Sequence, residues 1–472
     1  MECWLTPFTQ TPYELDTAGL SLPFVPKCVI DVELSETLPD ITSLTLHNGT
    51  PVRHALCLVW LHAQPLGLVT LHLMENGLSA HECACQIWAA LWKEIINHHY
   101  GDGLSVPPSL DGHGLPMMQE PLCQMMHVTF LQHAPHVSVI VPTRDRTEML
   151  AHGLDALLSQ DYSGTYDIFI IDNAPTTDAT AHLVCETYRA YNQLHYVRED
   201  RPGGSRARNC GLKYATGEIV AFTDDDAIVD KRWLSSLVAA FEIADNVGCV
   251  TGAVLPIELE TVYQEWFDCY SDLGDRFTRH IVDRYHRRPA HPLFPFLSGA
   301  LISGNNMAYR RSALQAVGGF DPALGPGSPT HGGEDLAAYF ALVCRGYQVV
   351  YEPKALIRHA HRCDLPGLTR QVYGYGVSLT AYLTKCIIDN PRLVLSLGRR
   401  IPYGLFYAFS SRSPRNAKNQ RAFTESLRRA ELKGMLYGPL AYVASRYRTH
   451  MKPNPTREKT PSIPILGAKK HS

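Results

Sequence analysis

The stretch GGSRARNCGLKYATGEIVAFTDDD, residues 203–226, decides the fold of this 472-residue chain. Two glycines open a segment with helical character, and the apolar run at 219–222 predicts a buried β-strand. Three aspartates follow at once, Asp224, Asp225 and Asp226. Carboxylates this close repel one another, so the protein must gain something from placing them at the end of a strand.

Strands and helices alternate around this stretch. Strands are predicted at 137–142, 167–172, 194–199 and 218–223, and helices at 146–160, 176–191 and 203–217. Repeated βαβ units predict an α/β fold with a doubly wound, mostly parallel sheet. Such sheets bind ligands beyond the carboxyl ends of their strands. Polar residues follow three of the predicted strands, at 142–146, 172–178 and 223–226, so the aspartates are expected at the ligand-binding edge.

The pattern continues after the triplet. A helix is predicted at 231–242, a strand at 247–256, and a further strand at 347–353. Between them, HGGEDLAAYFALVCRG (331–346) predicts a helix with Glu334 and Asp335 in its first turn. A long helical stretch is expected up to about Asp389.

Residues 1–135 predict a separate α+β module. Two apolar strands flank a Gln-Pro-Leu-Gly turn at 64–67, and an amphipathic helix follows at 79–100. His98 and His99 are adjacent on that helix and are interpreted as surface or capping histidines. The pattern assigns no chemistry to this module.

Charge is distributed unevenly along the chain. From Pro391 onward there are 17 Lys and Arg against 3 Asp and Glu, whereas the whole chain carries 43 and 46. We therefore expect a basic helical region at 363–450 and a disordered basic tail at 451–472. A basic end on an acidic body favours an anionic partner such as a membrane surface or a phosphate-bearing substrate. A solvated tail without a partner is the alternative.

The cysteines and the apolar segments bear on location. The chain has thirteen cysteines without metal-finger spacing, and its first residues lack the basic and apolar regions of a signal peptide. Both observations favour a reducing, cytoplasmic environment. LVLSLGRRIPYGLFYAF (393–409) is interrupted by Arg399 and Arg400, so we expect it to lie on the inner face of a membrane rather than cross it.

The aspartate triplet has the composition of a cation site. On extended chain Asp224 and Asp226 point to the same side. Two such carboxylates suit Mg²⁺ or Mn²⁺, which fill their other positions with water and phosphate oxygens. The alternative is a solvated Asp-rich turn that caps the following helix.

VSVIVPTRDRTEML (137–150), IIDNAPTTD (170–178), RARNCGLKYATGEIVAFTDDD (206–226) and GGEDL (332–336) follow one another at a recognisable spacing. Over about 137–362 the chain resembles the family-2 inverting glycosyltransferases. The resemblance implies the GT-A (nucleotide-diphospho-sugar transferase) fold over 136–362. It also implies metal-dependent transfer from a nucleoside-diphosphate sugar to a hydroxyl acceptor.

The resemblance assigns residues to the nucleotide. Asp172 is implied to recognise the nucleobase, and Thr143 and Arg146 to border the same pocket. A carboxylate can accept the imide N–H of uracil or thymine, although Asp172 could instead cap an Asx turn before Pro175. Arg208 is either a nucleotide contact or an exposed helix arginine.

The remaining assignments concern the diphosphate and the acceptor. Asp224 is implied to contact ribose or metal and Asp226 to bind metal, with Asp225 in the same nucleotide-binding motif. Asp335 is implied to be the base that deprotonates the acceptor; the alternative is that Glu334 and Asp335 only complement a helix dipole.

His359, in IRHAHR (357–362), is implied as a further metal ligand and favours Mn²⁺ over Mg²⁺. Ordinary surface histidines at 359 and 361 are the alternative.

Two other functions stay open. A nucleotidyltransferase also uses a metal aspartate pair, but PTRDRTEML (142–150) lacks the glycine-rich loop expected there. An inactive nucleotide-binding scaffold on the same fold is the non-enzymatic alternative. Glycolipid, polysaccharide and small-molecule acceptors are all compatible with the sequence, the basic aromatic C-terminal region favours a lipid-linked one, and no nucleic-acid partner is expected.

Overall fold

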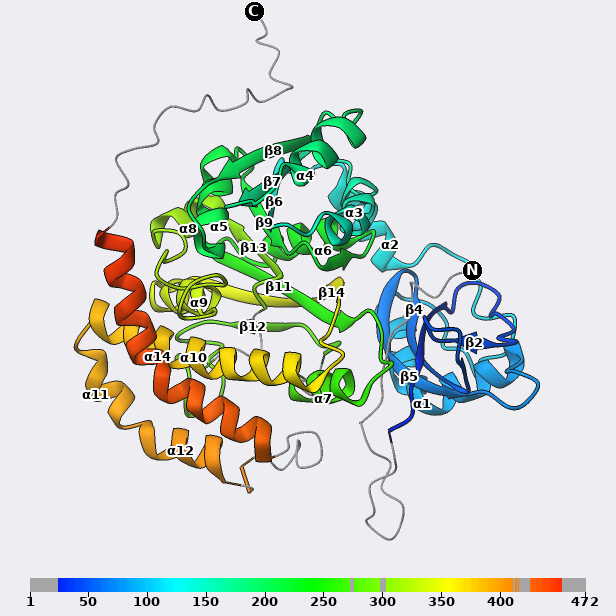
Figure 1. The fold of residues 1–472 in the computed structure, drawn as a ribbon. Helices are drawn as coiled ribbons and strands as arrows, with labels where there is room; N and C mark the ends of the chain where they lie inside the picture. The colour runs from blue at the N-terminus through cyan, green and yellow to red at the C-terminus, as the bar shows by residue number, and fades with distance from the viewer. Residues whose placement is uncertain are drawn as a thin grey trace, which may run out of the picture.

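The computed structural model describes residues 24–271, 276–297, 303–410, 412–413, 415 and 425–451. A central sheet carries the N-terminal module on one flank and the C-terminal helices on the other (Figure 1). The predicted disordered tail lies outside the described residues except for Met451, which ends a helix.

In the described part of the chain, the central sheet has nine strands in the order β10-β14-β11-β13-β9-β6-β7-β8, with β12 paired to β14. β8, β7, β6 and β9 are parallel neighbours, while β13 runs antiparallel between β9 and β11. The predicted α/β class is confirmed, and the antiparallel strands β10, β12 and β13 make the sheet mixed. The strands are β6 (Val137–Thr143), β7 (Tyr166–Asn173), β8 (Leu194–Glu199), β9 (Ile219–Thr223), β10 (Ala227–Val229), β11 (Val247–Pro256), β12 (His280–Val282), β13 (Asn306–Arg310) and β14 (Gln348–His359).

Helices cover both faces of this sheet. α3 (Thr147–Leu158) and α6 (Trp233–Ala239) pack on one face, where Leu154 and Trp233 are fully buried. α5 (Gly204–Tyr214), α8 (Arg311–Ala316) and α9 (Glu334–Cys344) pack on the other, around Leu314 and Leu342. Each fully buried leucine stabilises the fold by about 1.5–3 kcal/mol. The two cores fix the carboxyl ends of β6, β7 and β9 at one edge.

Two predicted helices are shorter than expected. The segment 176–191 forms only α4 (Ala179–His182) and one π-helical turn, η1 (Leu183–Thr187). In α4 and η1, only Thr180 and Val184 are buried. The segment therefore lacks the continuous apolar face with which a longer helix would pack against the sheet. Residues 240–243 continue α6 as a 3₁₀ turn, η2 (Ala240–Ile243).

The N-terminal module is a three-stranded sheet in the order β1-β4-β5, backed by α1. Its main elements are β1 (Cys28–Glu33), β4 (His54–Leu61), β5 (Gln64–His72), α1 (Ala80–Gly101) and α2 (Leu122–Leu131), with a small ladder of β2 (Leu44–Thr45) and β3 (Pro51–Val52). Ser79 and Glu82 start α1 with a capping box. The predicted α+β composition of the module is present.

The predicted turn at 64–67 is wrong. Leu61 pairs with Gln64, so the chain reverses at His62 and Ala63, both with φ of 56°. A two-residue turn with two positive φ angles matches the twist of the flanking strands. The sequence misleads here because His-Ala carries no turn signal, whereas Gln-Pro-Leu-Gly does and lies in β5.

The prediction that His98 and His99 lie at the surface is also wrong. The side chain of His98 is 14% exposed and His99 is buried. Both rings face His62, with ring centroids 5.1 and 5.8 Å from it. The end of α1 therefore packs against the β4–β5 turn instead of solvent.

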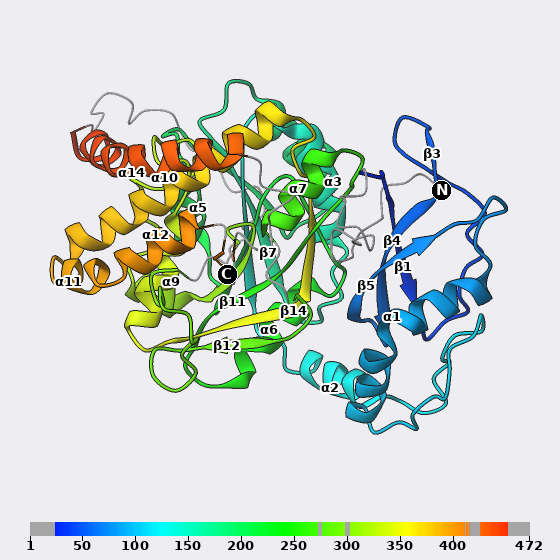
Figure 2. The same ribbon diagram turned by 90° about the horizontal axis from the view of Figure 1, so that it is seen from below.

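Among the described residues, the C-terminal region contains α10 (Leu365–Asp389), α11 (Leu393–Gly398), α12 (Ile401–Phe409) and α14 (Glu425–Met451). α10 and α14 cross in backbone contact, because a Cβ at Gly376 would lie 2.0 Å from the carbonyl oxygen of Glu431. Figure 2 shows these helices on the side of the sheet away from the N-terminal module. In the described part of the chain, every helix is too short or too polar to span a bilayer.

Candidate active site

A cavity of about 1430 Å³ opens at the carboxyl edge of β6 and β9. Residues 224–226, Arg208, Asp335 and His359 line one part of its wall. α10, α11, α12 and α14 line another part through largely apolar side chains, including Leu379, Leu397, Leu405 and Met435. The cavity therefore joins a charged region at the sheet edge to an apolar region formed by the C-terminal helices.

The three aspartates form the turn between β9 and β10 instead of extending the strand. Asp225 points inward, where Thr143 donates to it at 2.7 Å and Arg146 at 3.1 Å. Arg146 also reaches Asp226 at 3.2 Å. Burial raises the pKa of Asp225 despite these partners. The middle aspartate thus anchors the turn to the end of β6 and the start of α3.

Arg208 occupies the centre of the site. It is 2% exposed, which excludes the exposed-helix alternative. One guanidinium nitrogen donates to Glu334, and the other donates to Asp224 at 3.0 Å and to the carbonyl of Gly304 at 3.1 Å. Burial raises the pKa of Asp224 to about 6, although the Arg208 charge opposes it. Arg208 therefore ties the aspartate triplet to the start of α9.

Asp335 stays at the cavity wall while its neighbour Glu334 turns inward to Arg208. Gly333 precedes α9 with φ of 92°. A Cβ added at this position would lie 2.8 Å from the carbonyl oxygen of Ser378, so the chain passes close to α10 here. The backbone N–H of Leu336 donates to Asp335 at 2.8 Å. Burial raises the pKa of Asp335, which suits a carboxylate that must accept a proton.

Asp172, the penultimate residue of β7, has a different setting. Its side chain is fully buried, and the hydroxyl of Tyr196 donates to its Oδ2 at 3.0 Å. Its Oδ1 has no hydrogen-bond partner among the described residues. Burial raises the pKa of Asp172 to about 6. The next residue, Asn173, lines the cavity and Asp172 does not. The residue predicted to contact the nucleobase therefore lies behind the cavity wall.

His359 ends β14, which is longer than the predicted strand. Its Nε2 lies 3.1 Å from Asp226 Oδ1. Burial alone would raise the pKa of Asp226, but the hydrogen bond and charge of His359 lower it to about 2. His361 is buried against Phe267, 4.6 Å between ring centroids. The surface-histidine alternative is therefore wrong for both residues.

Asp226 and His359 supply only two of the ligands that a divalent cation needs. Asp226 and His359 offer an oxygen and a nitrogen 3.1 Å apart at the cavity wall, a donor pair that suits Mn²⁺. Among the described residues, Asp224 does not join them in a cluster of three close ligand atoms. The pair leaves the remaining positions of such a cation to water or to phosphate oxygens.

Sequence reasoning missed Glu334 as the partner of Arg208 and Tyr196 as the partner of Asp172. Tyr196 had a usable signal, since it lies in the middle of the predicted strand next to β7. The Arg208–Glu334 contact had none, because it joins residues 126 positions apart.

Residues 138–318 match the family model described as "Glycosyl transferase family 2". An N-acetylglucosaminyltransferase of Azorhizobium caulinodans is 26% identical over 227 residues, covering 48% of this chain and 54% of that protein. A pre-mycofactocin glycosyltransferase of Mycobacterium tuberculosis is 26% identical over 265 residues, covering 56% and 50%. The chain thus spans about half the length of these curated relatives.

A solved mannosyltransferase from Pyrobaculum calidifontis, in complex with GDP-Man and Mn²⁺, superposes with a TM-score of 0.43 at 19% identity. The superposition covers 67% of this chain and 88% of that one.

Proposed function

We propose that this chain, whose residues 138–318 form a family-2 glycosyltransferase domain of the GT-A class, is an inverting transferase that moves a sugar from a nucleoside-diphosphate sugar to a hydroxyl acceptor. The observation that carries this proposal is the convergence of the aspartate triplet, Arg208, Asp335 and His359 on one cavity. We assign the transferase domain to 136–362, the accessory module to 1–135 and the helical extension to 363–450.

The donor nucleotide is assigned to the ends of β6 and β7. Asp172 Oδ1 is a buried acceptor without a partner among the described residues, and it lies one residue behind Asn173 of the cavity wall. Thr143 and Arg146 hold Asp225 and so shape the pocket between the nucleobase and the diphosphate. Arg208 fixes Asp224, leaving the other carboxylate oxygen for the ribose.

Asp226 and His359 would hold a divalent cation, Mn²⁺ or Mg²⁺. Such a cation neutralises charge that develops on the leaving diphosphate. Arg146 is hydrogen-bonded to both Asp225 and Asp226 and carries a positive charge at the same position. Arg146 thereby keeps Asp226 ionised and oriented, while His359 must be neutral to bind the ion.

Asp335 is assigned as the base. An inverting displacement needs a carboxylate on the acceptor side to take the hydroxyl proton as that oxygen attacks. Asp335 lines the cavity on α9, and Gly304 beside it leaves its Oδ2 uncovered by any side chain at that position. The Arg208–Glu334 pair holds the start of α9 against the triplet, so it positions Asp335 without contacting the acceptor.

The acceptor is assigned to the apolar part of the cavity, which supports a lipid-linked hydroxyl compound. Large apolar side chains are exposed on the same helices, among them Leu395, Ile401, Leu405, Leu436 and Leu440. Exposed Arg392, Arg399, Lys433 and Arg448 accompany them. Apolar and basic side chains together favour peripheral contact with an anionic membrane, on its cytoplasmic face as the sequence predicts.

The proposal is tested by nucleotide release from a panel of nucleoside-diphosphate sugars with Mn²⁺ and a lipid-linked or soluble acceptor. Wild-type protein should release nucleoside diphosphate. Asp335→Asn should lose about 10²-fold or more of this rate, as expected for a general base, while nucleotide binding is retained. Asp245→Asn, an exposed control on the loop before β11, should match wild type.

Other outcomes point elsewhere. Release of pyrophosphate would indicate a nucleotidyltransferase. Tight nucleotide binding without turnover of any donor would favour the inactive scaffold, and full activity in Asp335→Asn would exclude that residue as the base.

A further inference from the structure

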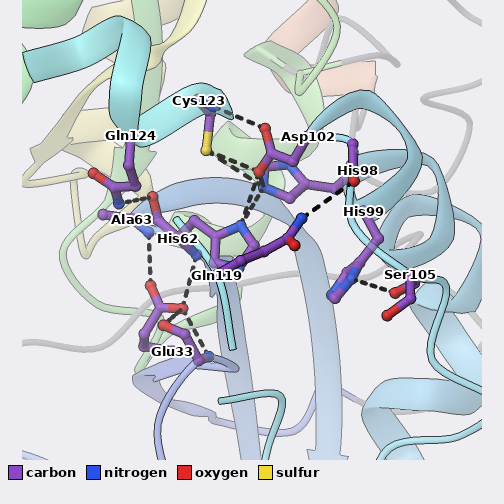
Figure 3. A network of polar contacts seen from close by, with 12 residues as sticks. Glu33, His62, Ala63, His98, His99, Asp102, Ser105, Gln119, Cys123 and Gln124 are labelled. Atoms are coloured by element: carbon purple, nitrogen blue, oxygen red, sulfur yellow. Dashed lines mark hydrogen bonds and ion pairs between the residues drawn. The ribbon is translucent and has the colours of Figure 1, made fainter. Parts of the chain in front are cut away.

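Four side chains of the N-terminal module converge on one point (Figure 3). His62 Nδ1 lies 3.1 Å from His98 Nε2 and 2.9 Å from Asp102 Oδ2. Cys123 Sγ lies 3.0 Å from the same Asp102 oxygen and 3.9 Å from His98 Nε2. All four ligand atoms lie within 4.8 Å of one another.

The four side chains come from three separate elements. His62 is in the β4–β5 turn, His98 and Asp102 stand one helical turn apart at the end of α1, and Cys123 is in the first turn of α2. His62 and Asp102 are buried, and His98 and Cys123 are partly buried. The cluster is therefore assembled by the tertiary fold and largely screened from solvent.

Neighbouring groups hold these side chains in place. Glu33 accepts from the backbone N–H of His62 at 3.0 Å and of Ala63 at 2.9 Å. The backbone N–H of Cys123 donates to the other oxygen of Asp102 at 2.9 Å. Gln124 donates to the carbonyl of His62 at 2.6 Å. Glu33 and Gln124 thus fix the backbone that carries His62, and the start of α2 fixes Asp102.

Hydrogen bonds alone account poorly for this arrangement. His62 Nδ1 carries at most one proton, yet it lies close to both a ring nitrogen and a carboxylate oxygen. His98 Nε2 in turn lies 3.1 Å from that oxygen. In a tetrahedral zinc site, neighbouring ligand atoms are about 3.3–3.5 Å apart for pairs of N and O, and about 3.6 Å apart where one of them is sulfur. Five of the six separations lie between 2.9 and 3.9 Å, and the sixth, between His62 and Cys123, is at most 4.8 Å.

We propose that His62, His98, Asp102 and Cys123 form a zinc site. Two imidazoles, a carboxylate and a thiolate make a four-ligand set of the kind that holds Zn²⁺ in a closed, structural site. Binding releases the Cys123 proton, and the two anionic ligands then balance the charge of the ion. Mg²⁺ and Ca²⁺ are disfavoured because two nitrogens and a sulfur are poor ligands for them.

The position of the site gives it a structural role. The ion would tie the β4–β5 turn, α1 and α2 together at one point. α2 in turn contacts the transferase domain: His127 lies 3.3 Å from Asp161, and Arg232 donates to Gln124 at 3.1 Å. Zinc would therefore stabilise the docking of the N-terminal module on the transferase domain.

The experiment measures zinc in the full-length chain. All proteins carry Asp226→Ala, so that zinc at the proposed catalytic cation site does not contribute. Each protein is incubated with Zn²⁺ and separated from free metal, and its zinc content per chain is measured by elemental mass spectrometry. The variants Cys123→Ser and His98→Ala are compared with Cys85→Ser, which removes an exposed thiol from α1.

The parent and Cys85→Ser should each retain one zinc per chain, and Cys123→Ser and His98→Ala should lose most of it. Co²⁺ in place of Zn²⁺ should give the parent a thiolate-to-cobalt charge-transfer band and the intense visible bands of tetrahedral cobalt. This second measurement does not depend on how the variants fold. A parent that binds no zinc, zinc unchanged in Cys123→Ser, or Co²⁺ without the charge-transfer band would each overturn the proposal.

Discussion

At the scale of single residues, each aspartate of the triplet has a basic partner, which offsets the repulsion among them. The pairs are Asp224 with Arg208, Asp225 with Arg146, and Asp226 with His359. Buried ion pairs of this kind are costly to break, since the remaining charge is left without a partner. The triplet is therefore stable only while the surrounding cations stay in place.

The first prediction concerns Arg208. Arg208→Met leaves Glu334 and Asp224 without their cation, so the free energy of unfolding should fall by about 3–5 kcal/mol. Chemical denaturation of wild type and variant measures this difference. Arg429→Met, which removes a solvent-exposed partner of Glu425, should change stability by less than about 1 kcal/mol. Combining Arg208→Met with Glu334→Gln should cost less than the sum of the single changes; additive costs would count against the buried pair.

The second prediction concerns the pH dependence of Asp224. Burial raises the pKa of Asp224 in the folded protein to about 6, above the ordinary value of an aspartate, about 3.9. The folded protein therefore binds this proton more tightly than the unfolded chain does, and the contribution to stability is lost as pH rises through 6. With chelator present, Asp224→Asn should raise the free energy of unfolding at pH 8 by about 1 kcal/mol, discounted for partial exposure, because Arg208 keeps its charged partner Glu334 in this variant. At pH 5 the gain should be smaller. An equal gain at both pH values would contradict this view of Asp224.

The residues of the candidate site were predictable where local sequence carries the signal. The aspartate triplet follows an apolar run and Asp335 opens a helix, so both could be placed at the sheet edge. Their partners could not, because the Arg208–Glu334 contact depends on how α5 and α9 pack. The same holds for the four proposed zinc ligands, which come from three elements of a module whose sequence suggested no chemistry.

At the scale of elements, the strands β6, β7, β8 and β9 were predicted well because buried parallel strands are short apolar runs. The segment 176–191 was predicted worse, since its helical composition lacks an apolar face to pack. The crossing of α10 and α14 was not predicted at all. It depends on glycines at facing positions, where a Cβ at Gly434 would lie 2.2 Å from the carbonyl oxygen of Tyr373.

The third prediction tests this crossing. Gly376→Ala forces a methyl group toward the backbone of α14, so the helices must separate at a cost of about 1–3 kcal/mol. The midpoint of thermal unfolding should fall, and transferase activity should fall with it because both helices line the cavity. Gly398→Ala, where a Cβ meets nothing within 4 Å, should behave as wild type. Unchanged stability in Gly376→Ala would mean that the helices are not in such close contact.

At the scale of the whole molecule, the charge asymmetry of the sequence corresponds to a division of the structure. The acidic body holds the sheet and the candidate site, and the basic end forms helices that close the apolar part of the cavity. A transferase with a lipid-linked acceptor needs its cavity close to the bilayer. The exposed apolar side chains of α11, α12 and α14 lie on the same helices that line this cavity.

The fourth prediction follows from this arrangement. Wild-type protein should sediment with anionic liposomes at low salt and less at high salt, because screening weakens the basic contribution. Leu436→Glu combined with Leu440→Glu places two charges on the exposed side of α14, where these leucines are 81% and 67% exposed. This variant should lose most of the bound fraction and keep its activity on soluble acceptors. Met126→Glu, a change at an exposed apolar residue of α2, should sediment as wild type. Equal sedimentation of all three proteins would exclude α14 as the membrane contact. The apolar part of the cavity would then be assigned to a soluble acceptor.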